Sequence, residues 1–262
     1  ILMLLTLVFS SEVLAKTHTT TASQKSHLTK ASNKQVSSKQ EYSRNSAKSS
    51  SLPDLRKYPS GTPRKKAFLR TVMPYITSQN AAITAERNWL ISKQYQGQWS
   101  PAERARLKDI AKRYKVKWSG NTRKIPWNTL LERVDIIPTS MVATMAAAES
   151  GWGTSKLARN NNNLFGMKCM KGRCTNAPGK VKGYSQFSSV KESVSAYVTN
   201  LNTHPAYSSF RKSRAQLRKA DQEVTATAMI HKLKGYSTKG KSYNNYLFAM
   251  YQDNQRLIAA HM

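Results

Sequence analysis

The chain has 262 residues, of which 43 are Lys or Arg and 13 are Asp or Glu, and its formal net charge is +30. This length predicts one or two domains, and an apolar content of 39% is low enough that part of the chain is expected to stay outside a packed core. The charge favours a polyanionic partner, which can be nucleic acid, an anionic lipid surface or an anionic cell-wall polymer. The sequence has no apolar run long enough for a membrane-spanning helix.

The first sixty residues divide into two segments of different composition. Residues 1–15 combine an apolar run with short side chains at the positions that a signal peptidase reads. This pattern is typical of a truncated secretory signal peptide and predicts export to the periplasm or cell envelope, with a buried strand or short core helix as the alternative. Residues 16–60 are rich in Ser, Thr and Lys and are predicted to form a disordered basic linker, because such a segment buries too little apolar area.

Apolar residues then return, and residues 61–125 are predicted to form a helical N-terminal region. Two stretches, 67–73 and 79–91, carry apolar side chains three and four positions apart, which is the spacing of an amphipathic helix. Ser100 and Glu103 form a capping box with a proline at the first helical position, and this combination predicts the start of another helix.

The remaining residues, 126–262, are predicted to form a mostly helical domain with one small β-lobe or loop-rich insertion. Residues 139–148 are apolar nearly all round, which indicates a buried helix. The segment 164–187 is rich in Gly, Lys and Asn and predicts turns or a small irregular β-lobe. Further helices are expected to begin at Thr154–Ser155, at the capping box of Ser189 and Glu192, at Asp221 and at Ser242.

Among the acidic residues, Glu149 has an unusual sequence setting. It follows a run of alanines and precedes Gly151 and Trp152, so other elements can pack closely around it. Burial against apolar groups raises the pKa of a carboxyl, and a helix that ends near Gly151 adds the effect of its carbonyl dipole. A carboxylic acid that stays protonated near neutral pH suits a general acid that protonates a glycosidic oxygen. The alternative is a glutamate at a helix end whose side chain turns out to water.

Three motifs in this region resemble those of a known enzyme family. The runs 147–158 (AAESGWGTSKLA), 162–168 (NNLFGMK) and 184–194 (YSQFSSVKESV) are similar to the peptidoglycan β-N-acetylglucosaminidases of glycoside hydrolase family 73. The resemblance covers residues 126–262 and implies a lysozyme-like α+β domain. It also implies that Glu149 is the general acid for cleavage of the β-1,4 bond between N-acetylglucosamine and N-acetylmuramic acid, and that the partner is a peptidoglycan glycan strand.

The second catalytic group is less evident. Glycosidases usually place two carboxylates around the scissile bond, and related enzymes carry the second one on the β-lobe, but this chain has no Asp or Glu from residue 164 to 189. Glu192 is the nearest substitute, although its place in a capping box offers a structural role instead. In a substrate-assisted route, the acetamido oxygen of the substrate attacks the anomeric carbon and no second carboxylate is needed.

A tyrosine is the other candidate for the reaction. The family's Tyr-Ala-Thr-Asp motif matches residues 236–239, YSTK, in which Tyr236 is retained and a lysine replaces the aspartate. Tyr236 is therefore a predicted catalytic residue that stabilises the oxocarbenium-like charge or orients the acetamido group. The alternative is a core tyrosine beside a glycine cap.

Five further residues are candidates for substrate binding: Trp152, Asn163, Phe165, Tyr184 and Tyr243. Trp152 either stacks on a sugar ring or fills the core beside a glycine-rich turn. Asn163 and Phe165 more readily shape the turn that holds a cleft wall, since Asn tolerates left-handed backbone conformations. Tyr243 and Tyr246 lie three positions apart in a predicted helix, so core packing is favoured for at least one of them.

The two cysteines and the histidines bear on cofactors and compartment. Cys169 and Cys174 have a spacing that allows a disulfide in an oxidising compartment, and free thiols are the alternative. Metal binding needs more ligands nearby than the five scattered histidines offer. We therefore expect neither a metal nor a cofactor.

Three classes of function are open at this point. An exported cell-wall hydrolase explains the charge as attraction to an anionic polymer. A non-catalytic wall-binding protein on the same fold is the second class, since the expected second carboxylate is missing. A nucleic-acid binder is the third and rests on charge alone; no nucleic-acid motif occurs and export removes that partner, so nucleic acid is not expected. The sequence makes no prediction about the oligomeric state.

Overall fold

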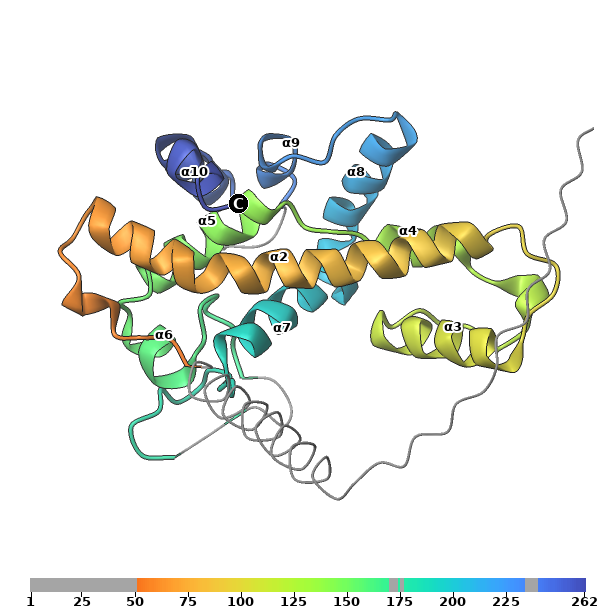
Figure 1. Ribbon diagram of the computed structural model, residues 1–262, viewed down its shortest axis with the longest axis horizontal. Helices are drawn as coiled ribbons and strands as arrows, with labels where there is room; N and C mark the ends of the chain where they lie inside the picture. The colour runs from red at the N-terminus through yellow and green to blue at the C-terminus, as the bar shows by residue number, and fades with distance from the viewer. Residues whose placement is uncertain (1–50, 170–173, 175–176, 234–239) are drawn as a thin grey trace, which may run out of the picture. The chain divides into compact units, whose positions relative to one another are not determined.

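The computed structural model describes residues 51–169, 174, 177–233 and 240–262, which belong to one compact unit spanning Ser49–Met262 (Figure 1). The predicted signal peptide and residues 16–50 of the predicted linker lie outside the described residues. The helices of this unit are α2 (Thr62–Lys93), α3 (Pro101–Arg113), α4 (Trp127–Arg133), α5 (Thr139–Ser150), α6 (Lys156–Asn161), α7 (Val190–Thr203), α8 (Ser208–Lys219), α9 (Ala226–Ile230) and α10 (Lys241–Ala259). Single 3-10 turns lie at η2 (Leu55–Lys57), η3 (Thr122–Lys124) and η4 (Pro205–Tyr207). Within these ranges, no helix has the length and apolar character that crossing a membrane requires.

The chain joins the core earlier than its composition predicts. Residues 51–60 belong to the segment expected to be a disordered linker, yet Leu52 and Leu55 are buried. The Leu52 backbone N–H donates to Asn162 Oδ1 at 3.1 Å, and Asp54 caps the 3-10 turn η2 that follows. The predicted linker is therefore too long at its C-terminal end, because two leucines three positions apart dock this basic segment onto the folded unit.

The long helix α2 connects the N-terminal region to the rest of the fold. It runs through Pro74 without a break, so the apolar stretches 67–73 and 79–91 are parts of one helix. Pro74 is exposed, and the backbone carbonyl that it leaves unpaired can bond to water. The buried side of α2 packs against α5 and α7 (Figure 1). The helical region 61–125 therefore shares its core with the segment 126–262.

Helix α5 is the buried helix that the sequence predicts. Every residue from Met141 to Ala147 is buried, and the helix packs against α2, α9 and α10. It ends at Ser150, because Gly151 adopts the left-handed conformation with φ 57° and ψ 51° and donates its N–H to the carbonyl of Ala147. Glu149 is thus the penultimate residue of a helix held on several sides.

Three of the predicted helix starts are confirmed by their hydrogen bonds. Ser100 and Glu103 form the expected reciprocal capping box of α3. Ser155 Oγ accepts from the N–H of Ala158 at 3.1 Å at the start of α6. Ser189 Oγ accepts from the N–H of Glu192, also at 3.1 Å, at the start of α7.

Two features of the C-terminal half differ from the prediction. Asp221 caps no helix, because its own backbone is left-handed, with φ 52°; α9 instead begins after Thr225, whose hydroxyl accepts from the N–H of Ala228. Helix α8 has no counterpart among the predicted elements. Its buried side chains include Arg211 and Arg214, so its inner face does not read as apolar in the sequence.

The insertion between α6 and α7 is loop-rich. Among the described residues it contains no strand, only the isolated antiparallel bridges Lys168–Tyr184 and Cys174–Ser185. The fold is therefore predominantly helical with a small irregular lobe, which agrees with the predicted lysozyme-like class.

Candidate active site

Glu149 lies where three separate parts of the chain meet. Its half-buried side chain projects from the end of α5. The hydroxyl of Tyr243, in α10, donates a hydrogen bond to its Oε1 atom. Gly166, in the loop after α6, lies so close that an added Cβ would be 3.3 Å from Oε2. Within the described residues, the carboxyl is thus held between a phenol and a glycine backbone, with no cation paired to it.

These surroundings favour the protonated form of the acid. Burial raises the pKa of Glu149, and the hydrogen bond from Tyr243 opposes that rise to a smaller extent. The position near the carbonyl end of α5 works in the same direction as burial. The side chain does not turn away into open water, so the alternative of a freely solvated helix-end glutamate is not what the structure has.

Tyr207 is a site residue that the sequence did not single out. It ends the 3-10 turn η4 between α7 and α8 and is half-buried. Burial raises its pKa, and the negative charge of Glu149 raises the pKa further. The phenol therefore lies within electrostatic reach of the carboxylate. No helical pattern or motif marks Tyr207, because its place depends on how η4 packs against α7 and α8.

The turn after Glu149 has an unusual backbone that favours glycine. Gly151, Trp152 and Gly153 are three consecutive residues with positive φ, at 57°, 55° and 79°. The left-handed conformation costs an L-residue such as Trp152 roughly 1–2 kcal/mol, whereas glycines on either side adopt it freely. At Gly153 a Cβ would lie 2.6 Å from Leu55 Cδ1, so the docked N-terminal segment also requires a glycine there.

Trp152 is packed rather than free. Its ring meets Phe68 of α2 edge-on, with ring centroids 5.6 Å apart, and the Lys65 ammonium lies 5.1 Å from its ring centroid. This arrangement favours the interpretation of Trp152 as a core plug that secures the turn on α2. Its stacking on a sugar stays a prediction.

Asn163 and Phe165 shape the loop that brings Gly166 to Glu149. The Asn163 amide donates to the carbonyl of Met167 at 2.8 Å and accepts from the Met167 N–H at 3.0 Å. Phe165 is buried and stacks on Tyr197 of α7 with ring centroids 3.9 Å apart. Both contacts agree with the turn-shaping role, and direct substrate contacts of either residue stay a prediction.

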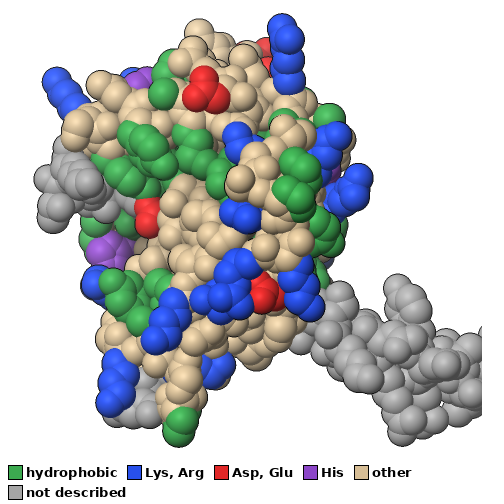
Figure 2. Space-filling model, turned by 90° about the vertical axis from the view of Figure 1, so that its left-hand side faces the viewer, with side chains coloured by type: hydrophobic (Ala, Val, Ile, Leu, Met, Phe, Trp, Pro, Cys, Tyr) green, Lys and Arg blue, Asp and Glu red, His purple; other side chains and the backbone are tan. Residues whose placement is uncertain are grey.

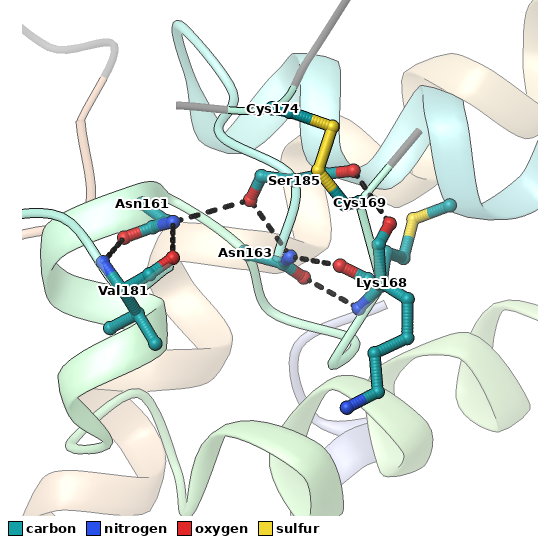
Figure 3. The surroundings of a disulfide bond; sticks show 8 residues. Asn161, Asn163, Lys168, Cys169, Cys174, Val181 and Ser185 are labelled. Carbon is teal, nitrogen blue, oxygen red and sulfur yellow. Dashed lines mark hydrogen bonds between the residues drawn. A yellow bond between two sulfur atoms is a disulfide. The ribbon is translucent and has the colours of Figure 1, made fainter. Parts of the chain in front are cut away.

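The asparagine run holds the rest of this loop, as Figure 3 shows for two of its members. Asn161 exchanges two hydrogen bonds with the backbone of Val181, and Asn163 also donates to the carbonyl of Ser185 at 3.0 Å. Asn162 ends α6 in the left-handed conformation and donates to the carbonyl of Phe187 at 3.2 Å. The amides of three consecutive asparagines thus hydrogen-bond to three different residues of the segment that leads from this loop to α7.

The two cysteines lie in the same lobe and are joined. A disulfide links Cys169 to Cys174, with a Cα–Cα distance of 5.1 Å (Figure 3). The structure therefore has the disulfide, and not the free thiols that were the alternative. In the described part of the chain, no group of three or more His, Cys, Asp or Glu side chains is arranged to hold a metal ion.

The other predicted site residues have different outcomes. Tyr184 accepts a hydrogen bond from the Lys168 ammonium at 2.9 Å. The Glu192 carboxylate accepts from both the N–H and the hydroxyl of Ser188, at 2.7 and 2.8 Å, so it serves the start of α7. Tyr236 lies outside the described residues. The catalytic roles of Glu192 and Tyr236 stay predictions.

The two tyrosines of α10 have different surroundings, and Tyr243 is the one that packs partly against the core. Tyr243 turns inward to Glu149, whereas Tyr246 is 54% exposed. Their rings lie 6.1 Å apart. The helix therefore supplies one tyrosine to the acid and leaves the other at the surface.

Comparison with known proteins agrees with this geometry. Residues 126–256, which are half of the chain, match the model of the glucosaminidase family described as mannosyl-glycoprotein endo-β-N-acetylglucosaminidase. No solved structure matches the chain. The matched range includes Glu149, Gly166 and Tyr243, which meet at the site. The chain therefore belongs to the glucosaminidase family and is a glycoside hydrolase of the endo-β-N-acetylglucosaminidase type.

Proposed function

We propose that this hydrolase is an exported enzyme that cuts the β-1,4 bond between N-acetylglucosamine and N-acetylmuramic acid in peptidoglycan, with Glu149 as its general acid. The observation that carries the proposal is the half-buried Glu149 carboxyl, whose pKa is raised by burial and which contacts Tyr243 and the backbone of Gly166. An acid in this state holds a proton that it can donate to the leaving oxygen.

The remainder of the reaction requires a nucleophile at the anomeric carbon. The lobe next to Glu149 has no acidic residue from 164 to 189, and Glu192 already accepts two hydrogen bonds from Ser188. We therefore favour attack by the substrate's own acetamido oxygen, or by a water, over attack by a second carboxylate. In the substrate-assisted route, the C–O bond breaks as Glu149 donates its proton, and water later opens the cyclised intermediate.

Charge and compartment support peptidoglycan as the substrate. The net charge of +30 attracts an anionic polymer, and the charged side chains on the face in Figure 2 are mostly Lys and Arg. The disulfide Cys169–Cys174 suits an oxidising compartment. The apolar pattern of residues 1–15 suits a secretory signal peptide. Export to the periplasm or cell envelope would bring the enzyme to this polymer.

Mass analysis of the products from purified sacculi tests the proposal. The wild-type chain should release fragments with N-acetylglucosamine at the new reducing ends, and Glu149→Gln should release none. Glu223→Gln is a matched control, since Glu223 is an exposed glutamate. New reducing ends of N-acetylmuramic acid would contradict the proposed bond. A wild-type chain that binds sacculi but releases no reducing ends would instead be a non-catalytic wall-binding protein.

A further inference from the structure

A lysine and a tyrosine form a pair on the loop beside Glu149, and nothing described so far uses the pair. Lys168 Nζ donates to the Tyr184 hydroxyl at 2.9 Å and lies 4.2 Å from the centroid of the Tyr184 ring. The two residues are also joined through their backbones as an isolated antiparallel bridge. A hydrogen bond and a cation–π contact together hold the ammonium in one position.

The backbone around Lys168 is fastened at several points. The hydroxyl of Ser185 donates to the carbonyl of Lys168 at 2.8 Å, and the N–H of Cys169 donates to the carbonyl of Gly183 at 3.1 Å. The next residue along the chain, Cys169, is tied to Cys174 by the disulfide. In Figure 3 the Lys168 side chain extends away from this disulfide. The backbone that bears the ammonium is thus held in place before a ligand binds, so binding costs little conformational entropy in this segment.

The pair has unused hydrogen-bond donors, and no carboxylate is paired with its ammonium within the described residues. Lys168 is exposed, makes no ion pair within the described residues, and belongs to a stretch without Asp or Glu from 164 to 189. An ammonium has three N–H donors, of which Tyr184 uses one, and the Tyr184 hydroxyl, which accepts that bond, still has its own proton to donate. Such a pair suits a carboxylate, which accepts through two oxygens.

The pair is also close to the acid. Gly166 touches Glu149, since an added Cβ would lie 3.3 Å from Oε2. Lys168 follows Gly166 by two residues, and two residues of chain span at most about 7 Å. The backbone of Lys168 therefore lies close to the acid, and a glycan strand that extends from Glu149 along this loop would meet its ammonium.

We propose that Lys168 and Tyr184 bind a carboxylate carried by the muramic acid side of the substrate, which makes Lys168 a specificity-determining residue. The inference rests on the proposed function. The carboxylate belongs either to the lactyl ether of muramic acid or to an attached stem peptide, and both offer the same chemistry.

Equilibrium binding tests the inference without relying on turnover. The full chain carrying Glu149→Gln, which keeps the ligands intact, is titrated with three oligosaccharides of equal length. These are chitotetraose, which has no carboxylate, a peptide-free N-acetylglucosamine–N-acetylmuramic acid tetrasaccharide, and the same tetrasaccharide with stem peptides. Lys168→Gln should weaken binding of a carboxylate-bearing ligand about tenfold, as expected for the loss of one charge-assisted hydrogen bond, and should leave chitotetraose almost unaffected.

Two further variants complete the test. Lys168→Arg should restore most of the affinity because it keeps the charge, and Lys182→Gln, which removes another exposed lysine of the same loop, should change little. Loss on the peptide-free tetrasaccharide assigns the lactyl carboxylate, and loss confined to the peptide-bearing one assigns the stem peptide. Equal loss on chitotetraose, or equal loss from Lys182→Gln, would overturn the inference. If the chain binds carboxylate-bearing ligands selectively but the wild type never cuts sacculi, the proposed function is refuted and the carboxylate site is not.

Discussion

Asp135 lies just before the start of α5 and Glu149 lies in its last turn, and the chain surrounds these two carboxylates in opposite ways. Asp135 is 2% exposed, and its oxygens lie 3.0 Å from Arg218, 3.6 Å from Arg87 and 3.7 Å from Arg214. Burial lowers the pKa of Arg214 to about 10, and the negative charge of Asp135 opposes that change. The anion and the buried cations therefore stabilise one another.

Glu149 has none of this support. Within the described residues its partner is the neutral hydroxyl of Tyr243, and burial raises its pKa. Helix α5 adds to the contrast, because its carbonyl end disfavours a negative charge at Glu149 whereas Asp135 precedes its N-terminus. Burial alone thus does not identify a catalytic acid. A carboxyl buried without a cation, and held by a neutral hydroxyl and a closely packed glycine, is the more informative feature.

The largest effect that tests this contrast is expected for Glu149→Gln. Loss of a general acid should lower the rate of reducing-end release by about 10²–10⁴-fold, while the circular dichroism spectrum stays that of the wild type. The amide fills the same space, so the loss is chemical and not structural. A variant that keeps near-normal activity on purified peptidoglycan would show that another residue donates the proton.

The same variant, Glu149→Gln, is also expected to change the thermal stability of the chain in a pH-dependent way. Because the pKa of Glu149 is raised on folding from the ordinary value of 4.5, the stability of the folded chain falls as the pH rises above 4.5, and the loss is complete above the folded-state pKa. Below pH 4.5 both states are protonated and this loss disappears. Glu149→Gln should therefore melt at a higher temperature than the wild type at neutral pH, with the difference shrinking as the pH falls. A lower melting temperature at every pH would make Glu149 a structural residue.

Asp135→Asn should have the opposite outcome. Breaking a buried ion pair leaves uncompensated charge and costs about 3–5 kcal/mol of unfolding free energy, which urea unfolding measures. The activity of the molecules that remain folded should be unchanged. Asp109→Asn is the matched control, because Asp109 pairs with Arg113 at the surface and its loss should cost less than about 1 kcal/mol. A small change for Asp135→Asn would remove the distinction between the two sites.

Local signals predicted much of this molecule, and long-range contacts were the part they missed. The capping box at Ser100 and the cap that Ser189 provides for α7 are formed within a few residues, so their sequence is enough to find these helix starts. The second half of the box predicted at Ser189 differs, because Glu192 accepts from Ser188 instead. The all-apolar run of α5 similarly indicates burial. By contrast, Arg211 and Arg214 are buried because they reach Glu132, Asp135 and backbone carbonyls of other elements, and a polar helix face gives no sign of that.

The candidate site divides in the same way. Glu149 could be found from its alanines, glycines and Trp152 together with the family resemblance. The approach of Gly166 and the inward turn of Tyr243 depend on how a loop and α10 pack against α5. Tyr207 depends on the docking of η4. These contacts join residues far apart in the chain, and no spacing rule encodes them.

Tyr243→Phe should sharpen the electrostatic part of the comparison. The hydrogen bond from Tyr243 lowers the pKa of Glu149, so its removal should raise that pKa further. A general acid is active while protonated, and the alkaline limb of the pH–rate profile should therefore move to higher pH. One neutral hydrogen bond contributes about 1 kcal/mol, so activity at the plateau should change by only about fivefold. Tyr246→Phe, at the exposed neighbour, should leave the profile unmoved. A downward shift for Tyr243→Phe would contradict the assignment.

The smallest effect is expected for Glu192→Gln, and it decides whether the lobe needs a second carboxylate. Glu192 accepts from the N–H and hydroxyl of Ser188 in the first turn of α7, where a negative charge adds about 0.3–1 kcal/mol through the helix dipole. The glutamine keeps an acceptor oxygen and loses only the charge, so stability should fall by that amount and the rate by less than about threefold. A hundredfold loss of rate in a variant that melts normally would instead make Glu192 the partner of Glu149. The comparison of Glu149 with Asp135 would then describe only half of the active site, because catalysis would require a protonated Glu149 and an ionised Glu192.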